Sequence, residues 1–419
     1  MEHTTCCVVG GGPAGMTIAL LLARAGVDVT VLEKHPDFLR DFRGDTVHPS
    51  TMRLLDELGL GSRFAALPSG RLDRMRMRIG EASIVAADFS RLRAPYDHIA
   101  MVPQADFLDL LADAAAEEPT FTLRRPAPVT GLLTSTEDGS PRVHGVRYLH
   151  QDGSEHELRA GLVLACDGRD SLVRQAARLR PHEFDVPMDV WQVRLPVPTD
   201  DAENARGAVV AHVEAGGAAV SMDRGTYAQV AYLIAKGTDA RRRAQGLDAF
   251  RAHLAGLLGV GDDVVGAITS WDDVPLLRVR MNRLRRWHRP GLLCLGDAAH
   301  AMSPVGGVGV NLAIADAVAA ARLLGPALRE RGTVTTADLA RVQRRRTAPT
   351  VITQRMQHGE HEMLLRPALD GTLTGVPAPL RAVGRSGLLQ AATAFLGGKG
   401  LFRERPPAFA RRVSAPERP

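Results

Sequence analysis

The sequence predicts an α/β fold in which a Rossmann-like domain, assembled from separate stretches of chain, alternates with a sheet-rich second domain. Two observations lead to this prediction. Strand-like segments end in a glycine or an acid at residues 9–10, 166–168 and 295–297, and each continues as a loop or helix. The stretches 71–97 and 183–277 instead show short strand patterns between Gly and Asp turns, and helical patterns dominate near the C-terminus.

Composition places the chain among globular proteins of two to three domains. Its 419 residues are 45% hydrophobic and 24% charged, which is ordinary for such proteins. The net charge of +5 comes almost wholly from arginines spread along the chain, so the sequence does not predict a nucleic-acid partner. We expect this charge to attract an anionic nicotinamide cofactor or an acidic substrate.

Cysteine usage and hydropathy bear on the cellular compartment. Cys6, Cys7, Cys166 and Cys294 lie in or beside predicted core strands, with no CxxC pair and no metal-ligand spacing. No signal peptide precedes the first strand, and no apolar run reaches the roughly 18–20 residues of a membrane span. We therefore expect a cytoplasmic protein with buried free thiols, no metal site and no membrane span.

The first motif is a strand–turn–helix–strand unit over residues 5–33. The turn at 10–15 reads G-x-G-x-x-G between a strand and an apolar helix, and the second strand ends at Glu33. In this context the glycines allow a tight turn and close approach of a pyrophosphate, while the helix N-terminus faces the phosphates. Glu33 suits the ribose hydroxyls of an adenosine and repels a 2′-phosphate, so FAD or NAD is favoured over NADP. The predicted cofactor-binding residues are Gly10, Gly12, Pro13, Ala14, Gly15, Glu33 and Lys34.

A second motif spans residues 291–324. After a strand at 292–295 come a Gly-Asp turn, a glycine-containing loop at 304–309 and an Ala-rich helix from about residue 311. Bare loop backbone offers N–H donors, and a helix N-terminus stabilises negative charge by roughly 0.3–1 kcal/mol. The pattern predicts a flat ligand that becomes anionic, as reduced flavin does; an ordinary strand–loop–helix crossover is the alternative. The predicted contacts are Gly296, Asp297, Pro304, Gly307, Val308, Gly309, Val310 and Asn311.

These motifs resemble those of a known family. The run Gly296-Asp297-Ala298-Ala299-His300, followed by Pro304, Gly307-x-Gly309 and Asn311, resembles the second FAD motif of the p-hydroxybenzoate-hydroxylase-like, group A flavoprotein monooxygenases. Asp167 and Gly168 resemble the family's DG motif, for which a bare Asp-Gly turn is the alternative. The resemblance covers roughly the first 360 residues and implies FAD as cofactor. Because only one dinucleotide fingerprint is present, NADH or NADPH would bind transiently at the surface.

The resemblance also implies a domain division. Residues 1–72, 98–182 and 278–365 would form a discontinuous FAD-binding domain of the GR2 type. Residues 73–97 and 183–277 would form a sheet-rich substrate domain, and 366–419 a C-terminal helix and loose tail. The active site would then lie where the two domains meet.

Several site residues are implied in the same way. In the resembled family an Arg-Gly pair lines the mobile position of the flavin and a Gln lies against the ribityl chain, which Arg43, Gly44 and Gln104 match. Gln104 is equally explained as the first polar residue of a helix. His48 would contact substrate or flavin, or else cap the helix that follows it. The expected catalytic residues are Arg43, His48, Pro304 and Gly307, the last two on the loop that floors the cavity.

Aromatic side chains of the second domain are the candidates for substrate binding, because they stack on planar rings. Each has a place in the hydrophobic core as its alternative explanation. The candidates are Trp191, Tyr227, Tyr232 and Trp271.

The reaction implied by the resemblance is a monooxygenation. NADH or NADPH reduces FAD, O₂ adds at the flavin C4a, and the resulting hydroperoxide transfers one oxygen to an aromatic or polycyclic small molecule such as a polyketide. The halogenase motif W-x-W-x-I-P is absent from the sequence. Epoxidation and Baeyer–Villiger oxygenation are alternatives on the same fold, and flavin binding without turnover is an alternative of another class. The expected assembly is a monomer or homodimer.

Overall fold

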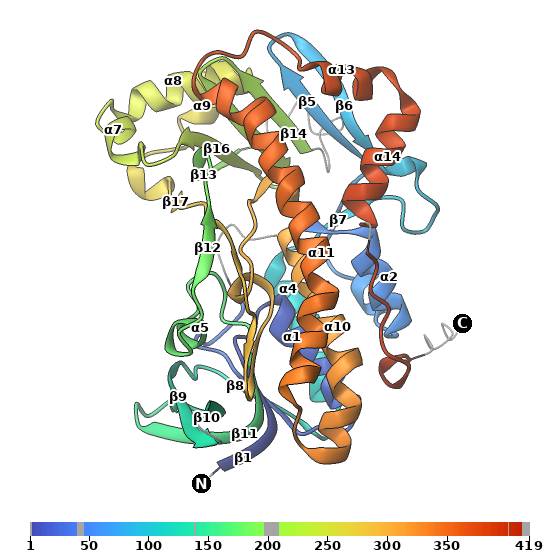
Figure 1. Ribbon diagram of the computed structural model, residues 1–419. Helices are drawn as coiled ribbons and strands as arrows, with labels where there is room; N and C mark the ends of the chain where they lie inside the picture. Colours follow the sequence, from blue (N-terminus) through green and yellow to red (C-terminus); the bar gives the residue numbers. More distant parts are fainter. Residues whose placement is uncertain (1, 40–45, 138–139, 197–208, 401, 413–419) are drawn as a thin grey trace.

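A sheet with a parallel core forms one end of the molecule (Figure 1), and it confirms the predicted α/β class with a Rossmann-like domain. The structure, a computed structural model, describes residues 2–39, 46–137, 140–196, 209–400 and 402–412. Strands β8, β2, β1, β11 and β20 run parallel in that order, and β19 is antiparallel to β20. Strands β10 and β9 continue antiparallel from β11. The strands are β1 (Glu2–Val9), β2 (Val29–Leu32), β8 (Phe121–Arg124), β9 (Val129–Glu137), β10 (Ser140–Leu149), β11 (Glu155–Ala165), β19 (His288–Arg289) and β20 (Leu292–Cys294).

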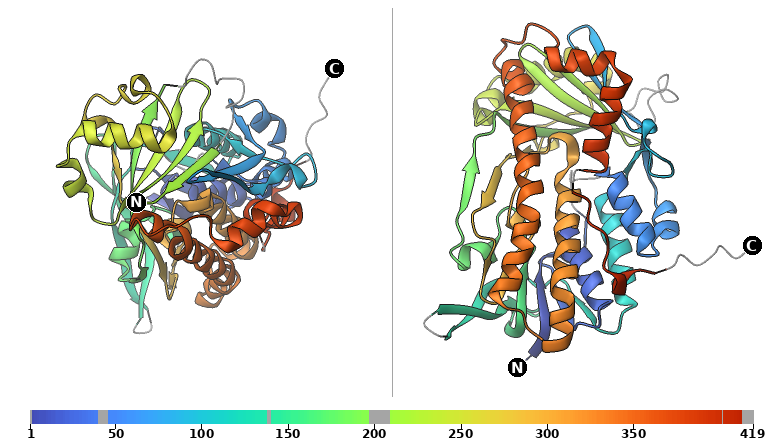
Figure 2. Two further views of the ribbon diagram at one scale, coloured as in Figure 1. Left: turned by 90° about the horizontal axis from the view of Figure 1, so that it is seen from above. Right: turned by 45° about the vertical axis from the view of Figure 1, so that its right-hand side comes forward.

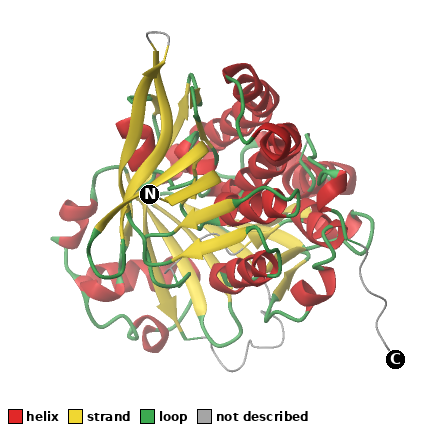
Figure 3. Ribbon diagram, turned by 90° about the horizontal axis from the view of Figure 1, so that it is seen from below, coloured by secondary structure: helices red, strands yellow, loops and turns green. Residues whose placement is uncertain are grey.

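Four helices pack together on the parallel strands. Helix α1 (Pro13–Ala23) is buried along almost its whole length, because it lies between α4 (Gln104–Ala116) and α10 (Gly309–Arg331). Helix α11 (Thr336–Glu360) runs beside α10 along the length of the molecule (Figure 2). Seen from below, most helices gather on one side of the strands (Figure 3). The apolar character of α1 is therefore that of a core helix.

Helix α10 with its preceding turn, Val305–Arg331, is long and apolar enough by composition to cross a membrane. No apolar run of this length was expected from the sequence. Half of the most apolar 18 residues of this stretch is buried inside the protein, and residues 317–321 are completely buried. Since α10 packs against α1 and α11, its apolar residues belong to the core of the folded chain.

A second sheet lies at the other end of the molecule (Figure 1), in the order β17-β13-β16-β15-β14-β5-β6. In β5 arginines alternate with Met75, Met77 and Ile79, and this face is half-buried as the period-two pattern predicted. The strand is antiparallel to β6 and parallel to β14. Helix α8 packs on the outer face of the sheet. The elements are β5 (Arg74–Ile79), β6 (Ala82–Asp88), β13 (Met188–Leu195), β14 (Val209–Glu214), β15 (Gly217–Asp223), β16 (Ala228–Ala235), β17 (Leu276–Leu277), α7 (Asp239–Arg243), α8 (Leu247–Leu258), α9 (Asp262–Val265) and η2 (Trp271–Asp273).

Short elements join the two sheets and complete the chain. Strands β3, β7 and β4 form a small sheet, and β12 pairs with β18. The bounds are β3 (Thr46–Val47), β4 (Gly70–Leu72), β7 (Ile99–Met101), β12 (Pro181–Phe184), β18 (Met281–Leu284), α2 (Pro49–Glu57), α3 (Gly61–Ala65), α5 (Leu172–Ala176), α12 (Arg366–Leu369), α13 (Ala378–Arg385), α14 (Gly387–Gly398), η1 (Phe89–Arg91), η3 (Gly296–Ala298), η4 (Val305–Gly307), η6 (Ala408–Ala410) and the π-helix η5 (His361–Leu365).

The C-terminal segment corrects one expectation. A loose tail was expected at the end of residues 366–419, but within the described part the Glu404 side chain is only 3% exposed. It forms ion pairs with Arg322 of α10 and with Arg345 and Arg346 of α11. Charge pairing with distant helices therefore fixes this segment, which its Arg- and Pro-rich composition does not reveal.

Candidate active site

The three turns singled out by the sequence meet at one edge of the parallel sheet. Val9 pairs with both Leu32 and Ala165, and Ala165 pairs with Cys294, so these four residues end their strands level with one another. The chain leaves the sheet beyond them as the glycine loop, Glu33, the DG turn and the Gly-Asp turn. Carboxyl ends of parallel strands are where α/β sheets bind ligands.

The glycine loop leaves space where a pyrophosphate would approach. Gly10 has φ +101°, and a Cβ there would lie 2.5 Å from the Cys166 carbonyl oxygen. A Cβ at Gly15 would lie 1.9 Å from the Gly10 oxygen, so both positions require glycine for packing. At Gly12 a Cβ would meet no protein atom within 4 Å, and α1 begins at Pro13 without a side-chain cap. The open N-terminus and the cradle at Gly12 fit a phosphate-bearing cofactor.

Glu33 braces this loop. Its side chain is buried, and Oε2 accepts a hydrogen bond of 2.7 Å from the Gly11 N–H while Oε1 accepts one of 3.0 Å from the His35 N–H. Lys34 beside it is exposed. The Glu33 carboxylate thus lies directly after the end of β2, where we expect the ribose of the adenosine from the sequence. The contact with a ribose stays a prediction.

The DG turn is tied to the Gly-Asp turn by an arginine. Asp167 accepts hydrogen bonds from the Ser171 hydroxyl (2.5 Å) and the Val173 N–H (3.1 Å), and burial raises the pKa of its carboxyl. Arg174 is 5% exposed and donates to the carbonyl of Ala298 at 3.2 Å. Within the described residues its hydrogen-bond acceptors are main-chain carbonyls. Gly168 keeps φ +84° at the turn itself.

The loop before α10 presents a helix N-terminus to this edge. Gly306 and Gly307 have φ +76° and +62°, and a Cβ at Gly307 would lie 2.6 Å from the Thr46 Oγ1. Helix α10 begins at Gly309 after Val308, with no side-chain cap. Its first N–H groups, which include that of Val310, have no acceptor within the helix and are suited to a negatively charged ring.

Asn311 uses its side chain to hold a neighbouring segment. Its Oδ1 accepts from the His48 N–H (3.0 Å) and the Thr51 hydroxyl (2.7 Å), and its Nδ2 donates to the Thr46 carbonyl (3.1 Å). A cofactor contact was expected here from the sequence, but this fixing of residues 46–51 onto α10 was not. No local pattern announces it, because the partners lie more than 250 positions apart.

His48 occupies the N-cap position of α2, yet its ring does not cap the helix. Nδ1 lies 2.7 Å from the Gly397 carbonyl oxygen, so this nitrogen carries the proton and donates. The ring is 2% exposed, and burial lowers its pKa to about 4, which keeps it neutral at pH 7. In the structure His48 links the flavin-side loop to α14. Arg43 and Gly44, expected to contact the flavin, lie outside the described residues.

The remaining expected cofactor residues are consistent with this arrangement. Asp297 is half-buried in η3, directly beyond the end of β20, and Pro304 precedes the two left-handed glycines. Gln104 is the first residue of α4, the position that the plain helical explanation also predicts. The open space at Gly12, the uncapped N-terminus of α10 and the nearby Glu33 carboxylate together fit FAD.

A family model described as an FAD binding domain matches residues 3–355. The chain belongs to this FAD-binding family. It is 34% identical over 375 residues to the 6-methylpretetramide 4-monooxygenase of Streptomyces rimosus, covering 87% of this chain and 85% of that protein. It is 30% identical over 324 residues to the 12-dehydrotetracycline 5-monooxygenase/anhydrotetracycline 6-monooxygenase of Streptomyces rimosus subsp. rimosus, covering 74% of this chain and 60% of that one. The chain is an FAD-dependent monooxygenase.

Solved structures share its fold. Pseudomonas aeruginosa PqsL in complex with 2-aminobenzoylacetate aligns with a TM-score of 0.72 at 22% identity, over 88% of this chain and 99% of that one. The p-nitrophenol 4-monooxygenase PnpA of Pseudomonas putida DLL-E4 aligns with a TM-score of 0.73 at 22% identity, over 95% and 100%. At 22% identity these two structures show only that this chain shares their fold.

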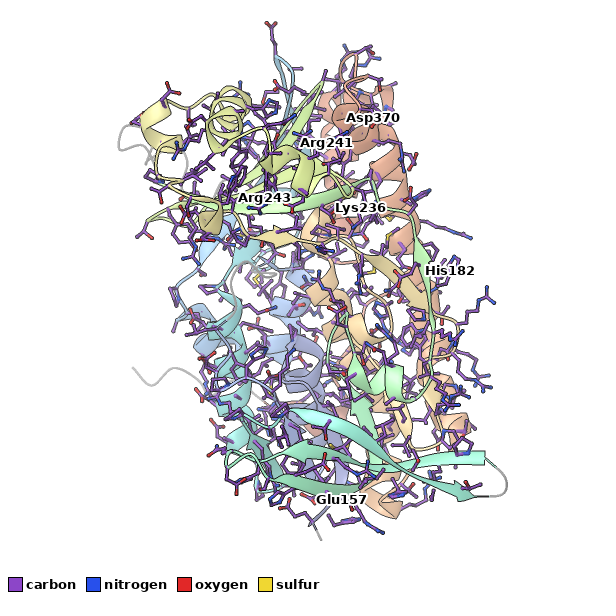
Figure 4. All side chains as sticks on the ribbon, turned by 90° about the vertical axis from the view of Figure 1, so that its left-hand side faces the viewer. Glu157, His182, Lys236, Arg241, Arg243 and Asp370 are labelled. Atoms are coloured by element: carbon purple, nitrogen blue, oxygen red, sulfur yellow. The ribbon has the colours of Figure 1, made fainter. Side chains whose placement is uncertain are left out.

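Most of the aromatic residues expected to bind substrate pack in the core of the monooxygenase's second sheet. Trp191 and Tyr232 are 1% exposed and stack at 5.9 Å, and Trp271 joins the same cluster at 5.2 Å from Trp191. Arg243, labelled in Figure 4, lies 4.8 Å over the Trp271 ring. This cluster packs under α8 on the outer face. The expectation that Trp191 and Tyr232 line a pocket is corrected, because alternation in the sequence does not show which face of a strand meets the helices. Trp271 was expected in a strand but lies half-buried in η2, where it packs against the same cluster.

The opposite face of the same strands points toward the FAD-binding part. Val190 and Leu233, next in sequence to Trp191 and Tyr232, pack in a cluster that Val305 of the glycine loop also joins. By strand alternation Gln192 and Gln229 lie on this inner face. Tyr227 precedes β16, half-buried, with the Arg194 guanidinium 5.3 Å from its ring.

Replacing Tyr232 by phenylalanine tests the corrected assignment. The hydroxyl accepts one hydrogen bond from Arg242 at 3.2 Å, so its loss should lower the free energy of unfolding by about 0.5–1.5 kcal/mol. The KM for the substrate that the enzyme hydroxylates should stay unchanged, because the Tyr232 ring faces α8. A KM raised about tenfold or more with unchanged stability would place Tyr232 in the substrate pocket after all.

Proposed function

We propose that this monooxygenase uses NADH or NADPH and O₂ to hydroxylate a polycyclic aromatic substrate of the polyketide type. The single observation that carries the proposal is the convergence of the glycine loop, the DG turn and the uncapped N-terminus of α10 at one sheet edge. The substrate class is supported by the 34% identity to a relative whose name states action on 6-methylpretetramide.

FAD, when bound, supplies the electron transfer and oxygen activation. The chain supplies position and charge stabilisation. The N–H groups of the α10 N-terminus, at Gly309 and Val310, would stabilise negative charge on the ring. Pro304 and Gly307 would form the wall of the cavity, and Arg43 and Gly44 would contact the flavin as the family resemblance implies. Because His48 is neutral and already donates to Gly397, its proposed role is to position the Thr46–His48 segment.

The inner face of the second sheet is the proposed substrate side. Gln192 and Gln229 bring polar groups to this face, and such groups orient the hydroxyl and carbonyl functions of a planar ring system. Gln229 is 6% exposed, and its Oε1 accepts from the Arg224 Nε at 3.0 Å. Polar groups of the inner face are proposed here in place of the aromatic ring contacts expected from the sequence.

We propose the domain division given above, supported by the separation of the two sheets. The four cysteines are free and buried, which suits the reducing cytoplasm. A monomer or homodimer remains the proposed assembly.

Anaerobic reduction tests the proposal. Purified protein reconstituted with FAD is mixed with NADH or NADPH, with and without 6-methylpretetramide as the probe, and the visible flavin band is followed. We expect bleaching by one of the two nucleotides, accelerated many-fold by the probe. If neither nucleotide bleaches the flavin under any condition, the protein binds flavin without turnover and the proposal is wrong.

A further inference from the structure

A glutamine of α11 holds the loop that precedes the glycine turn. Gln357 is 3% exposed, and its Oε1 accepts from the Ser303 N–H at 3.2 Å. Its Nε2 donates to two carbonyls, those of Ser303 at 2.9 Å and Val305 at 2.8 Å. One buried amide thus binds three main-chain groups within three residues. Such bidentate contacts fix the orientation of the peptide planes that they bind.

The other polar groups of this stretch also have protein partners. The Ser303 Oγ accepts weakly from the Val305 N–H at 3.4 Å and lies 2.9 Å from the His361 Nε2. Burial lowers the pKa of His361 to about 4, so its ring is neutral and its Nε2 pairs with the Ser303 hydroxyl, which can either donate or accept. Pro304 has no N–H, and its carbonyl accepts from Gly307 at 3.1 Å. Every main-chain polar group of 303–305 is therefore satisfied.

The loop consequently has two halves with opposite character. Residues 303–305 are hydrogen-bonded to Gln357 of α11 and to His361 of the π-helix η5. The residues after them contain Gly306 and Gly307 in left-handed conformations and lead into the uncapped start of α10. Only the second half offers unused N–H groups at the edge where FAD binds. The anchored first half fixes the point at which the second half begins, since the two are joined by a single turn.

We propose that Gln357 is a positioning residue that aims the N–H groups at the start of α10 toward the flavin ring. The consequence is a stronger preference of the site for reduced, anionic FAD over oxidised FAD. This inference rests on the proposed placement of the flavin ring at α10. It does not depend on the identity of the oxidised substrate.

A matched pair of variants isolates this contact. Gln357→Leu removes the amide that binds 303–305. Gln354→Leu removes an equally buried amide one turn earlier, whose Oε1 accepts from the Arg283 Nη1 at 2.7 Å and whose Nε2 donates to the Asn282 carbonyl at 2.8 Å and, weakly, to Ala301 at 3.4 Å. Both variants leave unsatisfied carbonyls near α11 and should lose comparable stability, but only the first releases the loop.

The measurement is the flavin midpoint potential of each FAD-loaded variant, obtained with a chemical reductant and mediator dyes and without substrate. We expect Gln357→Leu to move the potential to a more negative value, equivalent to about a tenfold loss of preference for reduced FAD. Gln354→Leu should stay within about twofold of the parent protein. Equal shifts in both variants, or no shift in either, would overturn the proposal.

Two further variants keep the test decisive if Gln357→Leu fails to fold. Ser303→Ala removes a single hydroxyl and should shift the potential in the same direction by a smaller factor. In Gln357→Glu a protonated carboxyl can still donate one hydrogen bond, so the parent preference should return as pH falls; a purely structural defect would not reverse. If NADH and NADPH fail to reduce the parent protein, the proposed reductant is wrong, while the chemically measured potentials still test the loop.

Discussion

Replacing Gly12 by valine is expected to abolish FAD binding while the fold stays intact. Gly12 has extended backbone angles, φ −75° and ψ −175°, which any residue adopts, and a Cβ there meets no protein atom within 4 Å. The added side chain instead fills the space through which the pyrophosphate approaches α1. The dissociation constant for FAD should rise at least about a hundredfold, roughly 2.7 kcal/mol, as measured by flavin fluorescence on titration.

Gly256→Val provides the control, because Gly256 lies in α8 and a Cβ there also meets no atom within 4 Å. Both variants should keep the circular dichroism and cooperative unfolding of the parent protein. Only the Gly12 variant should be colourless after reconstitution. A yellow Gly12→Val protein with parent-like affinity would show that the cofactor does not cross this loop.

Replacing Arg346 by methionine is expected to destabilise the fold by about 3–5 kcal/mol, because it breaks a fully buried ion network. Arg346 is 1% exposed and donates to the Asp316 Oδ1 at 2.7 Å, while His300 Nε2 lies 2.6 Å from Oδ2. These partners hold the pKa of Asp316 below its ordinary value of 3.8 despite burial. Urea unfolding at pH 7 measures the loss.

The neighbouring Arg345 supplies a surface control. It pairs with Glu404 at 2.8 Å but is 42% exposed, so Arg345→Met should cost about 1 kcal/mol or less.

The pKa of Asp316 is lowered in the folded state. Its contribution to the free energy of unfolding is therefore present above the unfolded pKa and disappears as pH falls through the folded pKa. Equal losses for the two arginine variants would contradict a special role for the buried network.

The binding edge was predictable because its signals are local. A glycine loop after a strand, an acid at the end of the next strand and a glycine turn before a helix each occupy a few adjacent residues. Parallel pairing then brings them together without further information: Val9, Ala165 and Cys294 end level in the register. Local pattern and sheet topology therefore identified the edge at which we propose that FAD binds.

Contacts between distant segments were not predictable. Asn311 binding to residues 46–51, the His48 ring on Gly397, and Gln357 on Ser303 all join segments that share no sequence pattern. For Trp191 and Tyr232 the alternation of side chains along a strand predicts that they share one face of the sheet. Only the packing of α8 shows that this face is the one covered by helices. In each case the deciding partner is long-range, and a single sequence does not specify it.

We propose that this FAD-dependent monooxygenase transfers one atom of O₂ to a polycyclic aromatic ring. Turnover of 6-methylpretetramide with NADH or NADPH under ¹⁸O₂, followed by mass spectrometry, tests it most directly. We expect a product that carries one ¹⁸O atom, with the second atom released as water. A product without ¹⁸O would contradict this proposal. So would consumption of NADH or NADPH that yields only hydrogen peroxide with every polycyclic aromatic compound tested.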